Sequence, residues 1–189
     1  MSPSMSSAPV PVKDSEPMTP ASNLESLFVQ GLRVDGALAE ALRAEGVNVR
    51  ALKGEYPLRV LNRCVDLACE HLYPDQPLES ARRQLGRIFV QGFTQTLLGR
   101  VVVVGLPMLG PVRYLKRFPD HLRSDSSQLR VLSVQVGERA FRLEFRNEVL
   151  VMPEFMAGVL LEWLKLARTE AALTIERHSP MSFDLHITW

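Results

Sequence analysis

Apolar residues alternate with polar ones in four short runs near the C-terminus, and this period of two is typical of strands that bury one face. The apolar positions are Leu132, Val134, Val136, Phe141, Leu143 and Phe145 in the first pair of runs, and Leu173, Ile175, Phe183, Leu185, Ile187 and Trp189 in the second. The turns Gly137-Glu138 and Ser179-Pro180 separate the two members of each pair. We therefore predict two hairpins, each with its apolar side chains on one face.

Between the hairpins the apolar period lengthens and predicts a helix over Pro153 to Arg168. The residues that recur at helical spacing are Phe155, Met156, Val159, Leu160, Trp163, Leu164 and Ala167. Proline favours the first turn of a helix, which places the helix start at Pro153. The C-terminal third thus has the predicted order β-β-α-β-β.

Helical spacing dominates the first two thirds of the chain, where prolines and glycines mark the ends of each element. The predicted helices are Leu24 to Val34, Gly36 to Glu45, Leu58 to Tyr73, Leu78 to Leu98 and Val112 to Leu122. Phe28-Val29 leaves a strand open as an alternative for the first of them. Gly86, Gly92 and Gly99 each cost about 0.5 to 1 kcal/mol relative to alanine inside a helix, so we expect close helix contacts there.

The segment Arg100 to Leu109 is ambiguous, because it contains four consecutive valines between helical segments. The valines favour a strand, whereas the position of the segment favours a buried helix. We predict a buried helix.

Together these elements define the α+β class. We predict one domain over residues 23–189, in which the helical N-terminal part packs on a four-stranded antiparallel sheet. Residues 1–22 contain several prolines, which block helix and sheet hydrogen bonds, and little apolar surface. This segment is predicted to be a disordered tail.

The composition narrows the function classes. The chain has 189 residues and a formal net charge of +1, which argues against a protein that binds nucleic acid by charge. It has two cysteines and no secretory signal, so we expect a cytoplasmic protein. The longest apolar run, Val101 to Leu109, is broken by Gly105 and Pro107, and no membrane span is predicted.

Two groups of residues include types found in metal sites or phosphate-binding loops, but their spacing does not match such sites. Cys64, Cys69 and His71 could ligate a metal, but the two cysteines lie about 140° apart around a helix. Gly99 to Pro107 has neither glycine-rich phosphate-binding pattern. Buried thiols and a core segment explain these residues better.

His178 and His186 lie on the two predicted strands of the last hairpin, together with Glu176 and Asp184. Imidazole beside carboxylate could act as a general acid or base, but a solvated polar face produces the same alternation. We predict no catalytic residue, no metal and no cofactor.

A basic face is predicted on the helix that ends at Leu122 and in the loop beyond it. Its residues are Arg113, Lys116, Arg117, His121 and Arg123. A solvated helix side explains this face, and an acidic partner or a phosphate group is the alternative.

Several short motifs carry a resemblance to a known family. They are Leu85-Gly86-Arg87, Thr96-Leu97-Leu98-Gly99-Arg100, Leu109-Gly110-Pro111-Val112-Arg113, Phe118-Pro119 and the helix from Glu154-Phe155 to Gly158. With them, the chain from Leu24 to Trp189 resembles a paralogous family of uncharacterised proteins expanded in myxobacteria. The family implies no activity.

More remotely, the order of elements is similar to vinyl-reductase-type ligand domains, Bet3-type transport-particle subunits and haem nitric-oxide-binding domains. This resemblance implies a dimer or a small-ligand binder, in several cases with an apolar cavity between helices and sheet. The chain departs from these relatives, because Arg177 to Trp189 has no cysteine cluster. Tyr114-Leu115-Lys116-Arg117 does not match the Tyr-x-Ser-x-Arg signature of the haem-binding relatives.

The leading functional hypothesis is a non-catalytic regulatory or scaffolding protein that forms a homodimer through protein contacts, with Leu27 and Phe28 in the interface. The first alternative is a sensor for a small apolar ligand, lipid-like or haem-like, with Phe89, Phe93 and Trp163 lining its cavity. An enzyme of unknown type is the second alternative.

Overall fold

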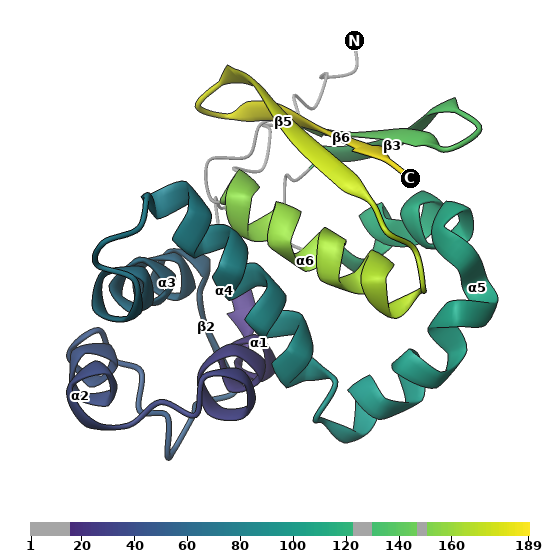
Figure 1. The fold of residues 1–189 in the computed structure, drawn as a ribbon. Helices are drawn as coiled ribbons and strands as arrows, with labels where there is room; N and C mark the ends of the chain where they lie inside the picture. Colours follow the sequence, from purple (N-terminus) through teal and green to yellow (C-terminus); the bar gives the residue numbers. More distant parts are fainter. Residues whose placement is uncertain (1–15, 123–129, 147–150) are drawn as a thin grey trace, which may run out of the picture.

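The computed structural model describes residues 16–122, 130–146 and 151–189. The elements in chain order are β1 (Met18–Pro20), α1 (Ala21–Leu24), the π-helical segment η1 (Glu25–Gly31), α2 (Gly36–Ala44), β2 (Glu55–Pro57), α3 (Leu58–Leu72), α4 (Leu78–Phe93), α5 (Leu97–Leu122), β3 (Arg130–Gly137), β4 (Ala140–Arg146), α6 (Pro153–Leu166), β5 (Ala172–Ser179) and β6 (Ser182–Thr188). Figure 1 shows their arrangement. The α+β class and the order β-β-α-β-β are confirmed.

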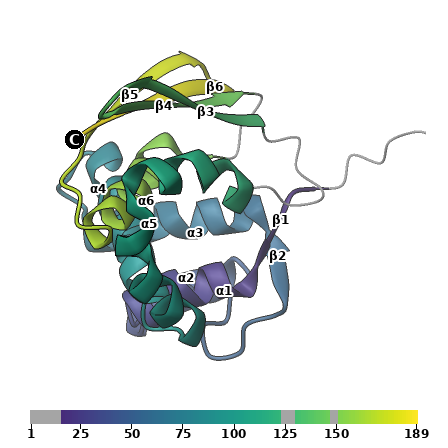
Figure 2. The ribbon, with the colours of Figure 1, turned by 90° about the vertical axis from the view of Figure 1, so that its right-hand side faces the viewer.

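The four C-terminal strands form one antiparallel sheet in the order β3-β4-β6-β5. At its centre Leu143 of β4 lies opposite Leu185 of β6, and both side chains are fully buried. They share a core cluster with Leu160 and Leu164 of α6, which lies against the inner face of the sheet (Figures 1 and 2). The alternation seen in the sequence therefore buries one face of β4 and β6 against α6.

The edge strand β3 departs from the prediction. Its register places Leu132 opposite Glu144, so Leu132 shares the outer face of the sheet with charged residues and is 56% exposed. Val131 is the residue of β3 that joins the core. The prediction that Leu132, Val134 and Val136 face the core is wrong by one position, and a shift of one residue exchanges the two faces of a strand.

A second core lies in the helical half of the molecule, between η1, α2, α3 and the first part of α4. Its fully buried side chains include Leu24, Leu27, Phe28, Leu42, Val65 and Leu85. Because Leu27 and Phe28 face this interior, a second copy of the folded chain cannot contact them. The predicted dimer interface at these two residues is therefore wrong.

The described structure includes residues before the predicted domain boundary at residue 23. Thr19 of β1 pairs with Tyr56 of β2 and is 3% exposed. The amide of Leu58 donates to the carbonyl of Pro17 at 2.8 Å. The prediction of a tail over residues 1–22 is too long at its C-terminal end, and residues 1–15 lie outside the described residues.

Helices α4 and α6 cross with their backbones in contact, and glycines allow this approach. A Cβ atom at Gly86 would lie 2.0 Å from the carbonyl oxygen of Phe155, and one at Gly158 would lie 1.9 Å from that of Arg83. Gly92 meets the carbonyl of Ser26 in the same way. The close helix contacts predicted from the glycines are thus present, and the crossing joins the two cores.

Candidate functional site

The first half of α5, residues 97–109, is the α5 arm, which curves along one side of the molecule (Figure 1). Gly110 has φ of 72° and ψ of 163°, which breaks the helical path after the arm. Gly99 and Leu106 are the arm residues that are buried. The prediction of a helix over Arg100 to Leu109 is confirmed, but the prediction that this helix is buried is wrong.

Apolar side chains on the arm form an outward stripe that faces solvent. Its members are Leu97, Val101, Val104 and Met108, which are 84%, 72%, 79% and 87% exposed. At about 100° per residue these four positions fall within roughly 60° of one another around the helix. Gly99 and Leu106 lie on the opposite side, so the arm packs through one face and presents the other.

In the described part of the chain, α5 is the one helix long and apolar enough to cross a membrane, and 17% of its most apolar window is buried. The break at Gly110 divides it into two pieces of about 20 Å each, at about 1.5 Å per residue. A hydrocarbon core is about 30 Å thick, so neither piece spans a bilayer by itself.

A cluster of four rings, the aromatic junction, is formed by residues that precede and follow the arm in the chain and by one residue of α6. Its members are Phe93 of α4, Tyr114 and Phe118 of α5, and Trp163 of α6. The ring centroids of Phe93 and Trp163 are 5.6 Å apart, and those of Tyr114 and Trp163 are 6.2 Å apart. Phe93 and Trp163 are half-buried.

Two of the three predicted cavity residues, Phe93 and Trp163, therefore lie together. The third, Phe89, packs instead on Phe155, with ring centroids 5.8 Å apart. At the junction the rings contact one another, so side chains occupy the place where the sequence predicts a ligand cavity.

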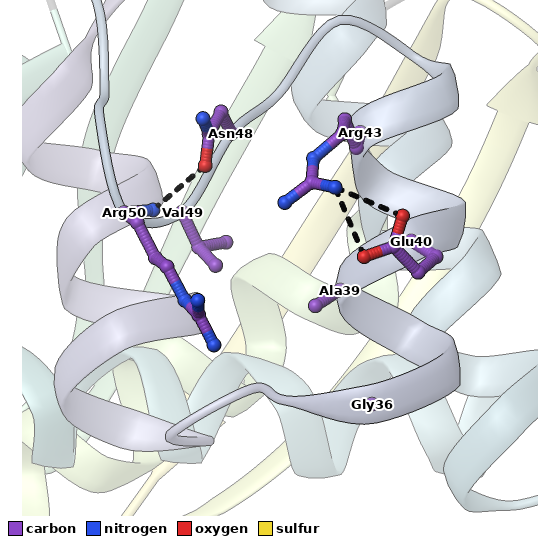
Figure 3. A pocket seen from close by; sticks show the side chains of 7 residues that line it. All are labelled: Gly36, Ala39, Glu40, Arg43, Asn48, Val49 and Arg50. Carbon is purple, nitrogen blue, oxygen red and sulfur yellow. Dashed lines mark hydrogen bonds and ion pairs between the residues drawn. The ribbon is translucent and has the colours of Figure 1, made fainter.

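Two open depressions on the described surface lie away from the aromatic junction. One, of about 290 Å³, is lined by Gly36, Ala39, Glu40, Arg43, Asn48, Val49 and Arg50. In it Glu40 holds the guanidinium of Arg43 at 3.0 Å, as Figure 3 shows. The other, of about 260 Å³, includes Asp66, Arg82 and Arg177 among its lining residues. Ion-paired walls of this kind do not suit an apolar ligand.

The second half of α5 carries the predicted basic face. Arg113, Lys116 and Arg117 are exposed, whereas Tyr114 and Leu115 between them are buried. The helix thus separates a core-facing side from a basic, solvent-facing side. Arg123, the last predicted member of this face, lies outside the described residues.

The outer face of the sheet carries a network of ion pairs around Asp184, whose side chain is 7% exposed. Arg146 donates to one carboxylate oxygen of Asp184 at 2.5 Å, and Nε2 of His178 lies 3.2 Å from the other. Burial would raise the pKa of Asp184, but the hydrogen bonds from Arg146 and His178 outweigh it and hold this pKa below its usual value.

The histidines of the last hairpin do meet carboxylates, as the sequence allows. Nε2 of His186 lies 2.8 Å from Glu176, and ligand atoms of Glu176, Asp184 and His186 lie within 4.8 Å of one another, a spacing that a divalent metal could bridge. Because Arg146 already satisfies one oxygen of Asp184, ion pairing across the sheet explains this arrangement.

The whole fold is similar to that of H-NOX domains. An H-NOX protein from K. algicida shares 11% identity over 90% of this chain and 96% of its own, with a TM-score of 0.65. An oxygen-binding H-NOX domain related to soluble guanylate cyclases shares 13% over 89% and 91%, with a TM-score of 0.59. An H-NOX structure that addresses haem distortion shares 13% over 90% and 95%, with a TM-score of 0.61. The remote resemblance to haem nitric-oxide-binding domains is confirmed for the fold.

Residues 18–189 match the family described as DUF2378, a protein of unknown function, and the chain belongs to that family. No curated protein sequence matches it.

The H-NOX fold implies haem, but the residues of this chain do not fit an iron site. Haem iron takes its protein ligand from histidine, cysteine, methionine or tyrosine. His71, His121 and His178 are exposed, and His186 belongs to the outer face of the sheet. None of the four histidines, all of which lie in the described part of the chain, is a buried residue.

The two cysteines, Tyr114 and Met108 do not fit an iron site either. Burial raises the pKa of Cys64 to about 12 and that of Cys69 to about 11, and both lie in the helical-half core. Burial also raises the pKa of Tyr114 well above its ordinary value, which disfavours the phenolate that would bind iron. Met108 points to solvent. None of these side chains offers a recognisable haem ligand at the aromatic junction.

Sequence reasoning missed the outward stripe, although it had a signal. Leu97, Val101, Val104 and Met108 follow helical spacing and define a second apolar face opposite Gly99 and Leu106. Apolar residues all around a helix usually indicate that the whole helix is buried. The sequence therefore predicted a buried helix, and the possibility that one face is exposed for a partner was not considered.

Proposed function

We propose that the protein is a non-catalytic sensor domain that binds an apolar small molecule at the aromatic junction and does not use haem. The proposal is supported by the similarity of nearly the whole chain to H-NOX domains, one of which binds oxygen. It is also supported by the apolar nature of the junction, where rings from three helices meet.

The observation that carries the proposal is the weak attachment of the α5 arm beside this junction. Gly99 packs against the carbonyl of Phe93, and Leu106 joins the core cluster that contains Tyr114. These are the buried residues of the arm. Displacing the arm therefore separates Gly99 from the carbonyl of Phe93 and Leu106 from the core cluster, while the rest of both cores stays packed.

The ends of the arm suit such a movement. The helical path is interrupted between α4 and α5 at Thr94 to Thr96, and again at Gly110. Hinges are commonly a few residues at the ends of helices that absorb the change in backbone angles. A ligand that occupies the junction would hold the arm in a second position and so report its presence at the surface.

The experiment uses tryptophan fluorescence with palmitate as the apolar probe. A Trp189→Phe variant leaves Trp163 as the only tryptophan, and we expect its emission to change saturably as palmitate is added. The matched control is Trp163→Phe, in which Trp189 stacks on Phe141 at the sheet and should not respond.

Two further measurements test the same proposal. Added haem should give no absorption band of a coordinated iron; a stoichiometric band would show that the chain is a haem protein. Native mass spectrometry of protein purified from its own host should show a retained apolar molecule. An empty chain there, together with an unresponsive Trp163, would contradict the sensor function.

A further inference from the structure

The outward stripe is a large apolar surface on the arm that no described residue covers. The arm packs through Gly99 and Leu106, and the stripe points the opposite way, so the stripe stays exposed even when the arm is fully docked. Leu98 beside it is 66% exposed. Exposed apolar surface of this kind marks an interaction site.

The charges on α5 indicate what the occupant is. Arg100 in the arm and Arg113, Lys116 and Arg117 beyond Gly110 are exposed basic residues, and Asp120 is the one acidic residue of this helix. Both halves of α5 lie on the same side of the molecule, which faces the viewer in Figure 2. Helix α5 thus combines an exposed apolar stripe with an excess of positive charge.

We propose that this side docks on an anionic lipid surface. The outward stripe enters the boundary between headgroups and acyl chains, and Arg113, Lys116 and Arg117 contact lipid phosphates. The break at Gly110 keeps the arm too short to span the bilayer but leaves it about 20 Å long, which is enough to lie in the interface.

A lipid surface fits better than a second copy of this chain. In a symmetric dimer each residue of the interface lies near its counterpart across the two-fold axis. Pairing the two stripes would bring the basic residues of one α5 towards those of the other, with Asp120 as the one acidic residue on each helix to offset them. Anionic headgroups neutralise the same residues.

The test is co-sedimentation of the full chain with vesicles of phosphatidylcholine alone or mixed with phosphatidylglycerol. We expect binding to the mixed vesicles that weakens as salt is added, because the charge attraction is screened. A double variant, Val101→Asp with Val104→Asp, should reduce binding by at least about tenfold, since it places two charges in the stripe. Each of Arg113→Gln, Lys116→Gln and Arg117→Gln should weaken binding by about fivefold.

Leu132→Asp is the matched control, because Leu132 is an exposed apolar residue on the sheet. It should leave binding unchanged, and circular dichroism should show that all variants keep the wild-type fold. Lack of binding by the wild type, equal binding to neutral vesicles, or equal loss in Leu132→Asp would each overturn the proposal. Sedimentation velocity that shows a dimer broken by the Val101→Asp, Val104→Asp variant would assign the stripe to a second copy instead. The proposal does not depend on a ligand at the aromatic junction.

Discussion

Gly86 and Gly105 are both helical glycines, yet their surroundings predict opposite effects of adding a methyl group. A Cβ atom at Gly86 would lie 2.0 Å from the carbonyl oxygen of Phe155, whereas one at Gly105 meets nothing within 4 Å. We expect Gly86→Ala to lower the free energy of unfolding by about 3 kcal/mol or more, as forced overpacking does. Gly105→Ala should raise it by about 1 kcal/mol, because alanine is the better helix former. Urea unfolding of both variants measures the two values, and similar values would show that the crossing of α4 and α6 is looser than described.

The ion pairs of Asp184 predict a pH dependence of stability. The pKa of Asp184 is lowered in the folded protein, so its ionised form stabilises the fold above the unfolded pKa of about 3.9, and this contribution is lost as the pH falls through the folded pKa. We expect Asp184→Asn to melt below the wild type at pH 7, with a smaller difference near pH 3. Glu40→Gln, which removes an exposed ion pair, is the control and should change little. An unchanged difference at both pH values would contradict this role of Asp184.

At the residue scale, the environment of a side chain could be predicted from the sequence where its residue type favours one kind of environment. Glycines inside the amphipathic helix α4 predicted close contacts, and Gly86 and Gly92 make them, whereas Gly105 in the exposed arm does not. An apolar residue can lie in a core or in an interface. Leu27 and Phe28 suit both environments, and which one they occupy depends on helices that lie far away in the sequence.

At the scale of elements, strand β1 corrects the predicted extent of the disordered tail. Met18–Pro20 forms a strand with β2, although the prolines and polar residues of the segment over residues 1–22 predict disorder. We expect deletion of residues 1–22 to lower the melting temperature by several degrees, because it removes the partner of β2 and the Pro17 acceptor of Leu58. Deletion of residues 1–15 keeps β1 and is the control. Equal melting of the two truncated chains would show that β1 contributes nothing.

The strands and helices themselves were largely predictable, because their apolar periods are regular and prolines mark their ends. The α5 arm and β3 were predictable in type but not in burial. Alternation along β3 offers two faces, and the pairing of Val131 with Phe145 decides between them. The valines of the arm suit a core equally well, and the break at Gly110 that directs the arm along the surface depends on a backbone angle that glycine permits but does not require.

At the scale of the whole molecule, the fold joins two cores through one helix crossing. The sheet core contains the rings of Trp163 and Trp189 at its margin, and the helical-half core contains Cys64 and Cys69. Helix α4 belongs to the helical half and crosses α6, which belongs to the sheet core, at Gly86 and Gly158. Backbones in direct contact leave little freedom for one half to separate while the other stays folded.

This connection predicts that the two halves unfold together. Tryptophan fluorescence reports the sheet core, and the reaction of Cys64 and Cys69 with a thiol reagent reports the helical half. The folded thiols should be unreactive near pH 8, because burial raises their pKa values to about 12 and about 11 and the thiolate is the reactive form. We expect both signals to change at the same urea concentration, as in a two-state transition. Thiol reaction at a clearly lower concentration would show that the helical half opens alone, and Cys64→Ala and Cys69→Ala would identify which part of α3 is exposed first.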